Sequence, residues 1–259
     1  MAELKRIIGF VVGINESSLL YDSLASLTFC DEVIYVDLES DDESLEIAKR
    51  TGAKCLSHTP VPYAEFVQSK ILPTLNSQWV LLLDPDERID KQLANQIVST
   101  INSLPRDSNV GAIRVPTCFY FKGKPLKGTP WGNNNTKTIV FKIEAIEFTT
   151  KVHRGRAISS KYVEISLPRL GQNTVHHYWM QSWKQLVAKH RVYLKHEGRS
   201  QGKLNVSWKT IFLKPFREFY ISLIKERGYR DGIRGLALSI FWSWYQTAAL
   251  LAVKSHSKG

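Results

Sequence analysis

The chain has 259 residues, of which 43% are hydrophobic and 23% charged, as in an ordinary globular protein. Its three cysteines are widely spaced, which excludes a cysteine-based metal site and suits a reducing compartment. The net charge of +11 is unevenly distributed: residues 1–104 carry a net charge of −8 and residues 105–259 one of +19. The opposite signs predict acidic residues around a cation in the first part and a basic surface for an anionic partner in the second.

Strands and helices alternate regularly in the first hundred residues. The predicted strands are Ile7–Gly13, Glu32–Asp37, Ala53–Ser57, Trp79–Leu83 and Val110–Val115. The predicted helices are Glu16–Thr28, Asp41–Thr51, Tyr63–Leu72 and Ile89–Leu104. This alternation predicts an α/β fold, a Rossmann-like, mostly parallel sheet flanked by helices.

After Pro116 the pattern changes to short strands and then to helices. The short strands are predicted at Phe119–Lys122, Thr138–Lys142, Phe148–Val152 and Gln172–Tyr178, with a Gly-, Pro- and Asn-rich loop over Lys122–Thr136. Helices are predicted at Trp183–Glu197, Val206–Lys225 and Arg230–Lys254. We therefore expect a catalytic domain over residues 1–178 and a C-terminal helical extension over residues 179–259.

The helical extension is both basic and rich in aromatic residues. Gly235–Val253 is mostly apolar but contains four polar residues, so it is borderline for a membrane span of about 20 residues. The stretch before it mixes Lys and Arg with Phe and Tyr. We favour contact with an anionic membrane surface over burial against the domain core, and both over a true span.

One motif lies at the end of the most apolar strand. Trp79–Leu83 has no polar residue, which is typical of a strand buried on both faces, and Asp84 and Asp86 follow it. Side chains two residues apart point to the same side of an extended backbone, so both carboxylates could reach one Mg²⁺ or Mn²⁺ ion. The structural alternative is a helix capped by Asp86 or Asp90.

Polar residues also follow the first two strands. Asn15 and Glu16 follow the first strand, and Asp37 ends the second, with Asp42 shortly after it. Carboxyl ends of parallel strands meet at one sheet edge, where α/β proteins bind nucleotides. No glycine-rich phosphate loop occurs, so we expect a metal ion to hold the phosphates.

These segments resemble family 2 glycosyltransferases, which have the GT-A fold. The resemblance rests on Val11–Glu16, Val36–Ser44, Gly52-Ala53 and Trp79–Glu87. Later segments are similar to a bacterial subgroup that adds sugars to the lipopolysaccharide core and related surface glycans; they are Lys137–His153, His177-Tyr178, Lys189, Tyr193 and Tyr229–Gly235.

The resemblance implies a nucleotide-sugar donor, most simply a UDP-sugar, and a glycolipid or saccharide acceptor. Asp37 would contact the uracil or ribose, with Asp42 supporting its loop, and Asp84 and Asp86 would hold Mn²⁺ or Mg²⁺ against the diphosphate. Transfer would invert the anomeric centre in a single displacement. The enzyme would work in the cytoplasm, peripherally at the inner face of the cell membrane.

Two positions depart from the family pattern. The subgroup's late His-Glu pair, whose carboxylate is a candidate base, reads His153-Arg154 here. The base could be Glu147, Glu144 or His153, with His153 alternatively a third metal ligand, or it could be absent. At the second position, the family's Asn before the fourth strand is Ser69, followed by Lys70, and these two residues would take its contacts with the donor.

Two other classes of function compete with this interpretation. A haloacid-dehalogenase-like phosphatase also has an Asp-x-Asp motif, but on its first strand, whereas Asp84 follows the fourth. A non-enzymatic basic module for membranes or nucleic acid is compatible with the charge. No nucleic-acid motif occurs, so no nucleic-acid partner is expected.

Overall fold

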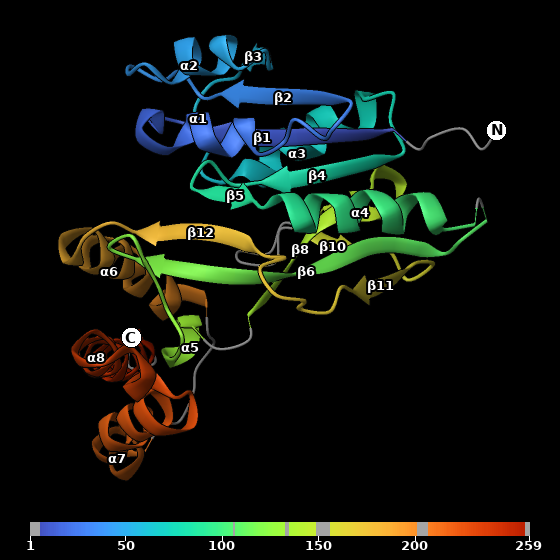
Figure 1. The fold of residues 1–259 in the computed structure, drawn as a ribbon. Coiled ribbons are helices and arrows are strands. Elements are labelled where there is room, and N and C mark those ends of the chain that lie inside the picture. Colours follow the sequence, from blue (N-terminus) through green and yellow to red (C-terminus); the bar gives the residue numbers. More distant parts are fainter. Residues whose placement is uncertain (1–5, 106, 133–134, 149–155, 201–206, 257–259) are drawn as a thin grey trace. The chain divides into compact units, whose positions relative to one another are not determined.

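The computed structural model describes residues 6–105, 107–132, 135–148, 156–200 and 207–256 (Figure 1). The chain forms two compact units. Unit 1 comprises Met1–Thr117 and Thr136–His177, and unit 2 comprises Cys118–Asn135 and Tyr178–Gly259. The predicted boundary near residue 178 did not anticipate that Cys118–Asn135 groups with the C-terminal helices.

Unit 1 is built on a mixed sheet. Its parallel part has the order β3 (Lys54–Ser57), β2 (Glu32–Asp37), β1 (Ile7–Gly13) and β4 (Trp79–Leu83). Antiparallel β8 (Thr136–Lys142) joins β4 to β6 (Val110–Phe121). The register places Gly13 of β1 opposite Asp37 of β2, so the loops after these strands leave the same edge.

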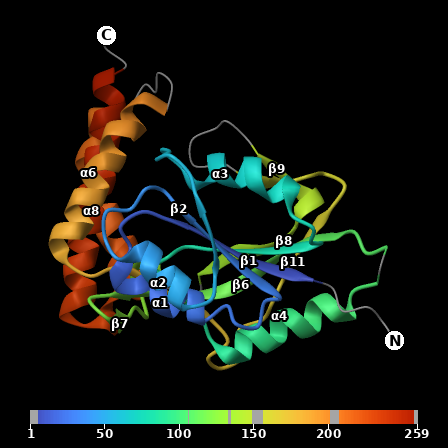
Figure 2. The same ribbon diagram turned by 90° about the horizontal axis from the view of Figure 1, so that it is seen from above.

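Helices cover both faces of this sheet, as Figure 2 shows for α3 (Ala64–Ile71) and α4 (Lys91–Ser103). Along β4, Trp79, Leu81 and Leu83 pack into one hydrophobic cluster, and Val80 and Leu82 into the other. The prediction of a strand buried on both faces is therefore confirmed, and so is the α/β fold class. The remaining elements of unit 1 are α1 (Ser17–Ala25), α2 (Ser44–Arg50), η1 (Leu72–Thr74), β5 (Glu87–Ile89), η2 (Ile143–Ala145), β9 (Ile146–Phe148), β10 (Arg156–Ile158) and β11 (Val163–Ser166).

Unit 2 is mainly helical. Its helices are α5 (Thr129–Gly132), α6 (Trp183–Ser200), α7 (Trp208–Tyr220), the π-helix η3 (Ile221–Lys225), the 3₁₀ turn η4 (Gly228–Asp231) and α8 (Ile233–His256). A hydrophobic cluster joins Phe121 and Leu126 to Trp179, Leu186 and Leu238. Among the described residues, no helix has both the length and the apolarity that crossing a membrane requires.

Glycines allow close backbone contacts in unit 2. A Cβ on Gly235 would lie 1.8 Å from the Gly228 carbonyl oxygen, and one on Gly128 would lie 2.0 Å from the Arg227 oxygen. Neither position can accept a larger residue without displacing the backbone. The buried Asp231 carboxylate joins the same segments, because it accepts hydrogen bonds from the backbone N–H groups of Lys127 and Gly128.

Several predicted elements differ from the observed ones. β6 runs uninterrupted from Val110 to Phe121 and so combines two predicted strands. β7 (Lys124–Pro125) and α5 lie in the predicted loop, and the last strand of the sheet, β12, is Val175–Met180. The helix expected from Ile89 begins at Lys91, because the Asp90 carboxylate caps it by accepting a hydrogen bond from the Leu93 N–H, at 2.9 Å.

Candidate active site

Hydrogen bonds join the loops that follow β1 and β2. The Asn15 N–H donates to Ser40 Oγ (3.0 Å), and Asn15 Oδ1 accepts from the Asp41 N–H (2.9 Å). The Ser17 N–H donates to Asp42 Oδ2 (3.0 Å). Asn15 has a φ of +55°, a strained value that its amide helps to maintain through these local bonds. The structure therefore brings together the two loops that the sequence placed at one sheet edge.

Asp42 and Glu16 also take part in the hydrogen bonds between the segments that follow β1 and β2. Limited burial raises the pKa of Asp42, but hydrogen bonds from Ser44 and Ser17 outweigh it and lower the pKa to about 2. The Glu16 N–H donates to Ser44 Oγ at 2.9 Å. Asp42 therefore stays ionised and supports the loop after β2, the position that the resemblance implies for it.

Asp37 ends β2 and is 3% exposed. Its carboxylate accepts hydrogen bonds from the Ser40 hydroxyl (2.6 Å), the Ser40 N–H (3.1 Å) and the Tyr35 hydroxyl (3.2 Å). Burial, followed by the nearby Asp37 charge, raises the pKa of Tyr35, so the phenol keeps its proton and remains a donor. Asp37 is thus fixed in one orientation at the sheet edge.

Asp84, Pro85 and Asp86 form a tight turn after β4. The Glu87 N–H donates to the Asp84 carbonyl (2.9 Å), and the Asp84 N–H donates to Glu87 Oε2 (3.1 Å). A Cβ on Gly13 would lie 2.9 Å from Pro85 Cγ, so the glycine at the end of β1 lets this turn approach. The backbone at Pro85 and Asp86 is a turn and not an extended strand. Asp84 pairs with Lys137 and Asp86 lies next to His177, and the expectation that both carboxylates hold one cation stays a prediction.

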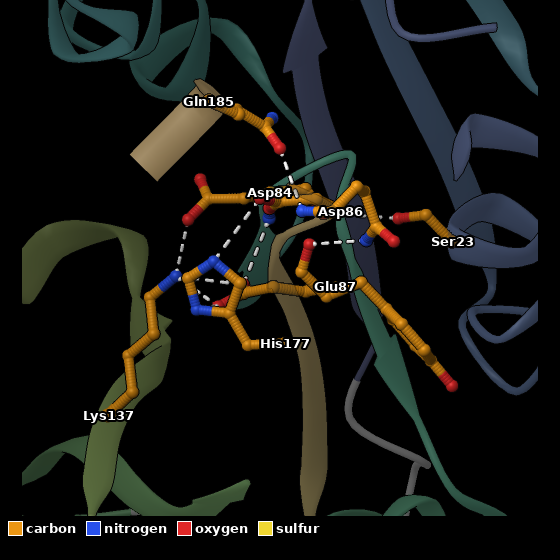
Figure 3. A network of polar contacts seen from close by, with 9 residues as sticks. Ser23, Asp84, Asp86, Glu87, Lys137, His177 and Gln185 are labelled. Atoms are coloured by element: carbon orange, nitrogen blue, oxygen red, sulfur yellow. Dashed lines mark hydrogen bonds and ion pairs between the residues drawn. The ribbon is translucent and has the colours of Figure 1, made fainter. Parts of the chain in front are cut away.

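Lys137 lies between two of the acids (Figure 3). Its ammonium is 2.5 Å from Asp84 Oδ2 and 2.8 Å from both carboxylate oxygens of Glu87. Lys137 is near the start of β8, which runs antiparallel to β4 and therefore begins at the edge where β4 ends. Glu87 is fully buried, so this ion pair has little exposure to water on the Glu87 side.

The charges of this trio support one another. Burial raises the pKa of Asp84, but the Lys137 ammonium outweighs burial and lowers that pKa to about 2. Burial also raises the pKa of Glu87, which the Asp84 charge reinforces and Lys137 opposes. Burial lowers the pKa of Lys137, but the two carboxylates outweigh it and raise that pKa above its ordinary value. Lys137 is therefore a permanent cation beside Asp84.

His177 lies beside Lys137 at the acidic turn (Figure 3). Its Nε2 is 3.3 Å from Asp86 Oδ2, and its Nδ1 is 3.4 Å from Glu87 Oε1. The residue is placed by β12, which pairs antiparallel with β5 so that His177 is opposite Glu87. His176 faces the other way, with its Nε2 3.7 Å from Asp90, as expected for adjacent residues of a strand.

The donors at this turn fit a metal site that a substrate completes. Within the described part of the chain, no three His, Cys, Asp or Glu side chains are grouped to hold a metal ion. The Asp86 carboxylate and the His177 imidazole nevertheless provide two adjacent donors. Mg²⁺ commonly takes one or two protein carboxylates and completes its shell with phosphate oxygens and water.

Three of the predicted residues lie away from this turn. Ser69 and Lys70 are in the last turn of α3, and Ser69 donates to the Phe66 carbonyl of its own helix. Glu144 follows the end of β8 that pairs with Trp79, at the opposite end of β4 from Asp84, and it contacts Tyr162. The structure therefore does not bring Ser69, Lys70 or Glu144 to the acidic turn.

The other two candidate bases are placed differently. Glu147 is exposed on β9, which pairs with β10. His153 lies outside the described residues. From β10, Arg156 is close enough to Asp84 for its charge to help lower the pKa of that carboxyl.

Sequence reasoning missed Glu87, Lys137 and His177 as partners of the acid pair. Glu87 entered the sequence analysis only as the last residue of the Trp79–Glu87 segment. A buried Glu and a Lys on different strands give no local signal, since their pairing depends on β8 running antiparallel to β4. The adjacent His176 and His177 do give a local signal, because neighbouring residues of a strand face opposite ways and only one of the two can face a site.

No family model matches the chain, but individual proteins do. It is 26% identical to an uncharacterized glycosyltransferase of Rickettsia prowazekii (strain Madrid E), over 71% of this chain and 69% of that protein. It is 24% identical to an uncharacterized glycosyltransferase of Rickettsia conorii, over 98% of this chain and 91% of that protein. Among solved structures, a mannosyltransferase from Pyrobaculum calidifontis in complex with GDP-Man and Mn²⁺ is similar, with a TM-score of 0.57 and 14% identity. The similarity covers 99% of this chain and 88% of that one.

The structural similarity confirms the predicted GT-A fold. At 14% identity it establishes the fold alone. The two Rickettsia relatives, together with this fold, support the assignment of the chain as a glycosyltransferase.

Proposed function

We propose that this protein is an inverting, family 2 glycosyltransferase that uses a nucleotide-sugar donor and a divalent metal ion. The observation that carries the proposal is the set of polar side chains at the carboxyl edge of the sheet. Asp37 is the last residue of β2, and Asp84, Asp86, Lys137 and His177 surround the turn after β4. The edge of an open α/β sheet is where such folds bind nucleotides. The mannosyltransferase of the same fold holds GDP-Man and Mn²⁺.

The loops after β1 and β2 would receive the nucleoside. Asp37 is held by Ser40 and Tyr35, and its carboxylate would accept a hydrogen bond from the ribose or uracil. Asn15 and Asp42 fix the loops on either side of it. A UDP-sugar is our preferred donor, on the resemblance of these loops to family 2.

The turn after β4 would receive the diphosphate. Asp86 and His177 would hold Mn²⁺ or Mg²⁺, which supplies positive charge against the departing nucleoside diphosphate when bound. Lys137 keeps Asp84 ionised and in place, and buried Glu87 fixes Lys137. The turn therefore combines two metal donors with an ammonium group close to where phosphate charge would lie.

The acceptor hydroxyl needs a base as it attacks the anomeric carbon. Glu147 and His153 remain our candidates, since Glu144 is at the far end of the sheet. We propose a glycolipid or surface-glycan acceptor, as in the lipopolysaccharide-related subgroup that the sequence resembles. Glu147→Gln and His153→Ala then separate the two bases, because only the true base should lower the rate without weakening donor binding.

The decisive variant is Asp86→Asn, compared with Asp22→Asn. Asp22 is an exposed acid whose ion pair with Arg88 lies on the surface. A thermal-shift screen of UDP-, GDP-, dTDP- and CMP-sugars, with and without Mn²⁺, measures donor binding, because a ligand at 100 times its Kd stabilises by about 2.7 kcal/mol. We expect one donor to raise the Tm only with metal, and Asp86→Asn to remove that shift and the release of nucleoside diphosphate.

Asp22→Asn should keep both the shift and the activity. Full donor binding and turnover in Asp86→Asn would refute the assigned metal site. A Tm that no nucleotide-sugar changes would refute the proposed function itself.

A further inference from the structure

An exposed row of aromatic side chains runs along α7. Trp208, Phe212, Phe216 and Tyr220 follow one another at intervals of four residues, which places them along one side of a helix. All four are exposed, Phe212 by 71% and Phe216 by 65%. The opposite side of α7 buries Ile211. The aromatic row is therefore not part of the core of unit 2.

α8 exposes a second apolar row. Ile233, Leu236, Ile240, Trp244 and Leu251 are all exposed, with Ile233 at 87%. Their spacing also places them on one side of the helix, and no charged residue occurs from Leu236 to Leu251. The buried side of α8 carries Leu238, Ser239, Ser243 and Tyr245.

The two helices pack through a different surface. Ser243 Oγ donates to the Pro215 carbonyl of α7 at 2.7 Å, and Ser222 Oγ of η3 donates to Ser239 Oγ of α8 at 2.9 Å. These contacts occupy the buried sides. The aromatic row of α7 and the apolar row of α8 both remain on the surface of unit 2, and we call the two together the apolar rows.

Apart from the half-buried Glu226, the charged residues described on the surface beside the apolar rows are basic. Exposed cations accompany α7 and the turn before α8; they are Lys209, Arg217, Lys225, Arg227 and Arg230. The acids Glu218 and Asp231 are buried, where Glu218 is 3.7 Å from Lys214 and Asp231 binds backbone N–H groups. A partner of this surface would meet apolar side chains flanked by positive charge.

We propose that the apolar rows insert into the surface of an anionic lipid bilayer. Large apolar surfaces are rarely left exposed without a partner, and aromatic side chains next to Lys and Arg match the acyl boundary and the charged headgroups of such a surface. The charge complementarity favours lipid over a second, equally basic copy of this chain. The functional role of this binding rests on the proposed function, because a lipid-linked acceptor lies at a membrane surface.

The test is sedimentation of the full chain with vesicles, without any nucleotide-sugar. We expect binding to vesicles of phosphatidylcholine with phosphatidylglycerol, weakened by salt, and much less to phosphatidylcholine alone. Phe212→Ser/Phe216→Ser should reduce the partition coefficient about tenfold or more, since two large apolar side chains no longer insert. Lys209→Gln/Arg217→Gln should reduce only the preference for the anionic lipid.

The matched control is Tyr63→Ser/Phe66→Ser, which removes two exposed aromatics from unit 1. It should bind vesicles like the unaltered protein, and an unchanged Tm shows that each variant folds. Equal binding to both lipids, no binding, or unaltered binding by Phe212→Ser/Phe216→Ser would overturn the inference. A dimer that this double variant dissociates, without vesicle binding, would assign the surface to a second copy and overturn it too. A donor-dependent Tm shift in the same samples separates these failures from failure of the proposed function.

Discussion

The two units handle charge in opposite ways. Unit 1 has 17 Lys and Arg against 20 Asp and Glu, a net charge of −3, whereas unit 2 has 18 against four, a net charge of +14. In unit 1 the important carboxylates are fixed by partners, Asp37 by Ser40 and Glu87 by Lys137. In the described part of unit 2 most cations are exposed, and those of α7 and the turn before α8 accompany the apolar rows.

The difference shows that the net charge of a unit does not tell whether its charged side chains pair within the protein or are available to an external partner. The nearly neutral unit 1 contains the ion pair with a fully buried carboxylate, Lys137 with Glu87, because a buried charge needs a partner. The strongly basic unit 2 has charges available for an external partner, because few acids are present to pair with them. Four variants can break or sharpen this comparison.

The largest effect should come from Lys137→Met. Removing the ammonium leaves the fully buried Glu87 without its cation, which costs about 3 to 5 kcal/mol for a buried pair. Urea denaturation followed by Trp fluorescence measures the loss. Lys49→Met is the control, because its pair with Glu46 is 3.5 Å long and exposed on both sides.

A second variant tests whether the buried charge is the cause. Adding Glu87→Gln to Lys137→Met should recover part of the stability, since no uncompensated charge then remains. If Lys137→Met and Lys49→Met had the same free energy of unfolding, the pairing of buried charges would not distinguish unit 1 from unit 2.

A smaller effect is expected for Asp231→Asn in unit 2. The carboxylate accepts three hydrogen bonds from two backbone N–H groups, at 2.8 to 3.0 Å, and the amide would replace one acceptor oxygen with a donor. Hydrogen bonds to a charged group contribute about 1.5 to 3 kcal/mol. Limited trypsin digestion should cut faster after Lys122 and Lys127, while Asp107→Asn, at an exposed position of unit 1, should leave the rate unchanged. Equal digestion rates for the two variants would show that the Asp231 carboxylate does not stabilise unit 2.

The smallest effect concerns acid stability. The folded pKa of Asp42 is about 2 against an ordinary value of 3.8, so its stabilisation is present above pH 4 and is lost as the pH falls towards 2. Because Asp42 is exposed, we expect about 1 kcal/mol or less. The Tm difference between the unaltered protein and Asp42→Asn should shrink over this range, whereas that for Glu46→Gln should change little. A constant difference down to pH 2 would contradict the assigned role of its hydrogen bonds.

The sequence predicted the parallel part of the sheet closely. β1, β2 and β4 have the predicted bounds, because continuous apolar runs ending in polar residues mark buried parallel strands. It missed β5 and β11, which have three and four residues and no distinctive pattern. Strands this short are defined by their partners in the sheet.

The site was predictable where it depends on parallel strand ends. Asn15, Asp37 and Asp42 lie together because β1 and β2 are parallel neighbours. Lys137 and His177 were not predictable as partners of the acid pair. Lys137 lies on β8, which pairs antiparallel with β4, and His177 lies on β12, which pairs antiparallel with β5. Local sequence also failed to show that the turn at Pro85 directs Asp84 and Asp86 to different partners.

The strands β6 and β12 each begin in unit 1 and end in unit 2. A premature stop codon after residue 178 would therefore not yield a shortened but intact catalytic protein. Phe121 and Leu126 would still be translated, but Trp179, Leu186 and Leu238, against which they pack, would be missing. We expect such an allele to behave as a null through proteolysis of its product, even though Asp84, Lys137 and His177 are still encoded.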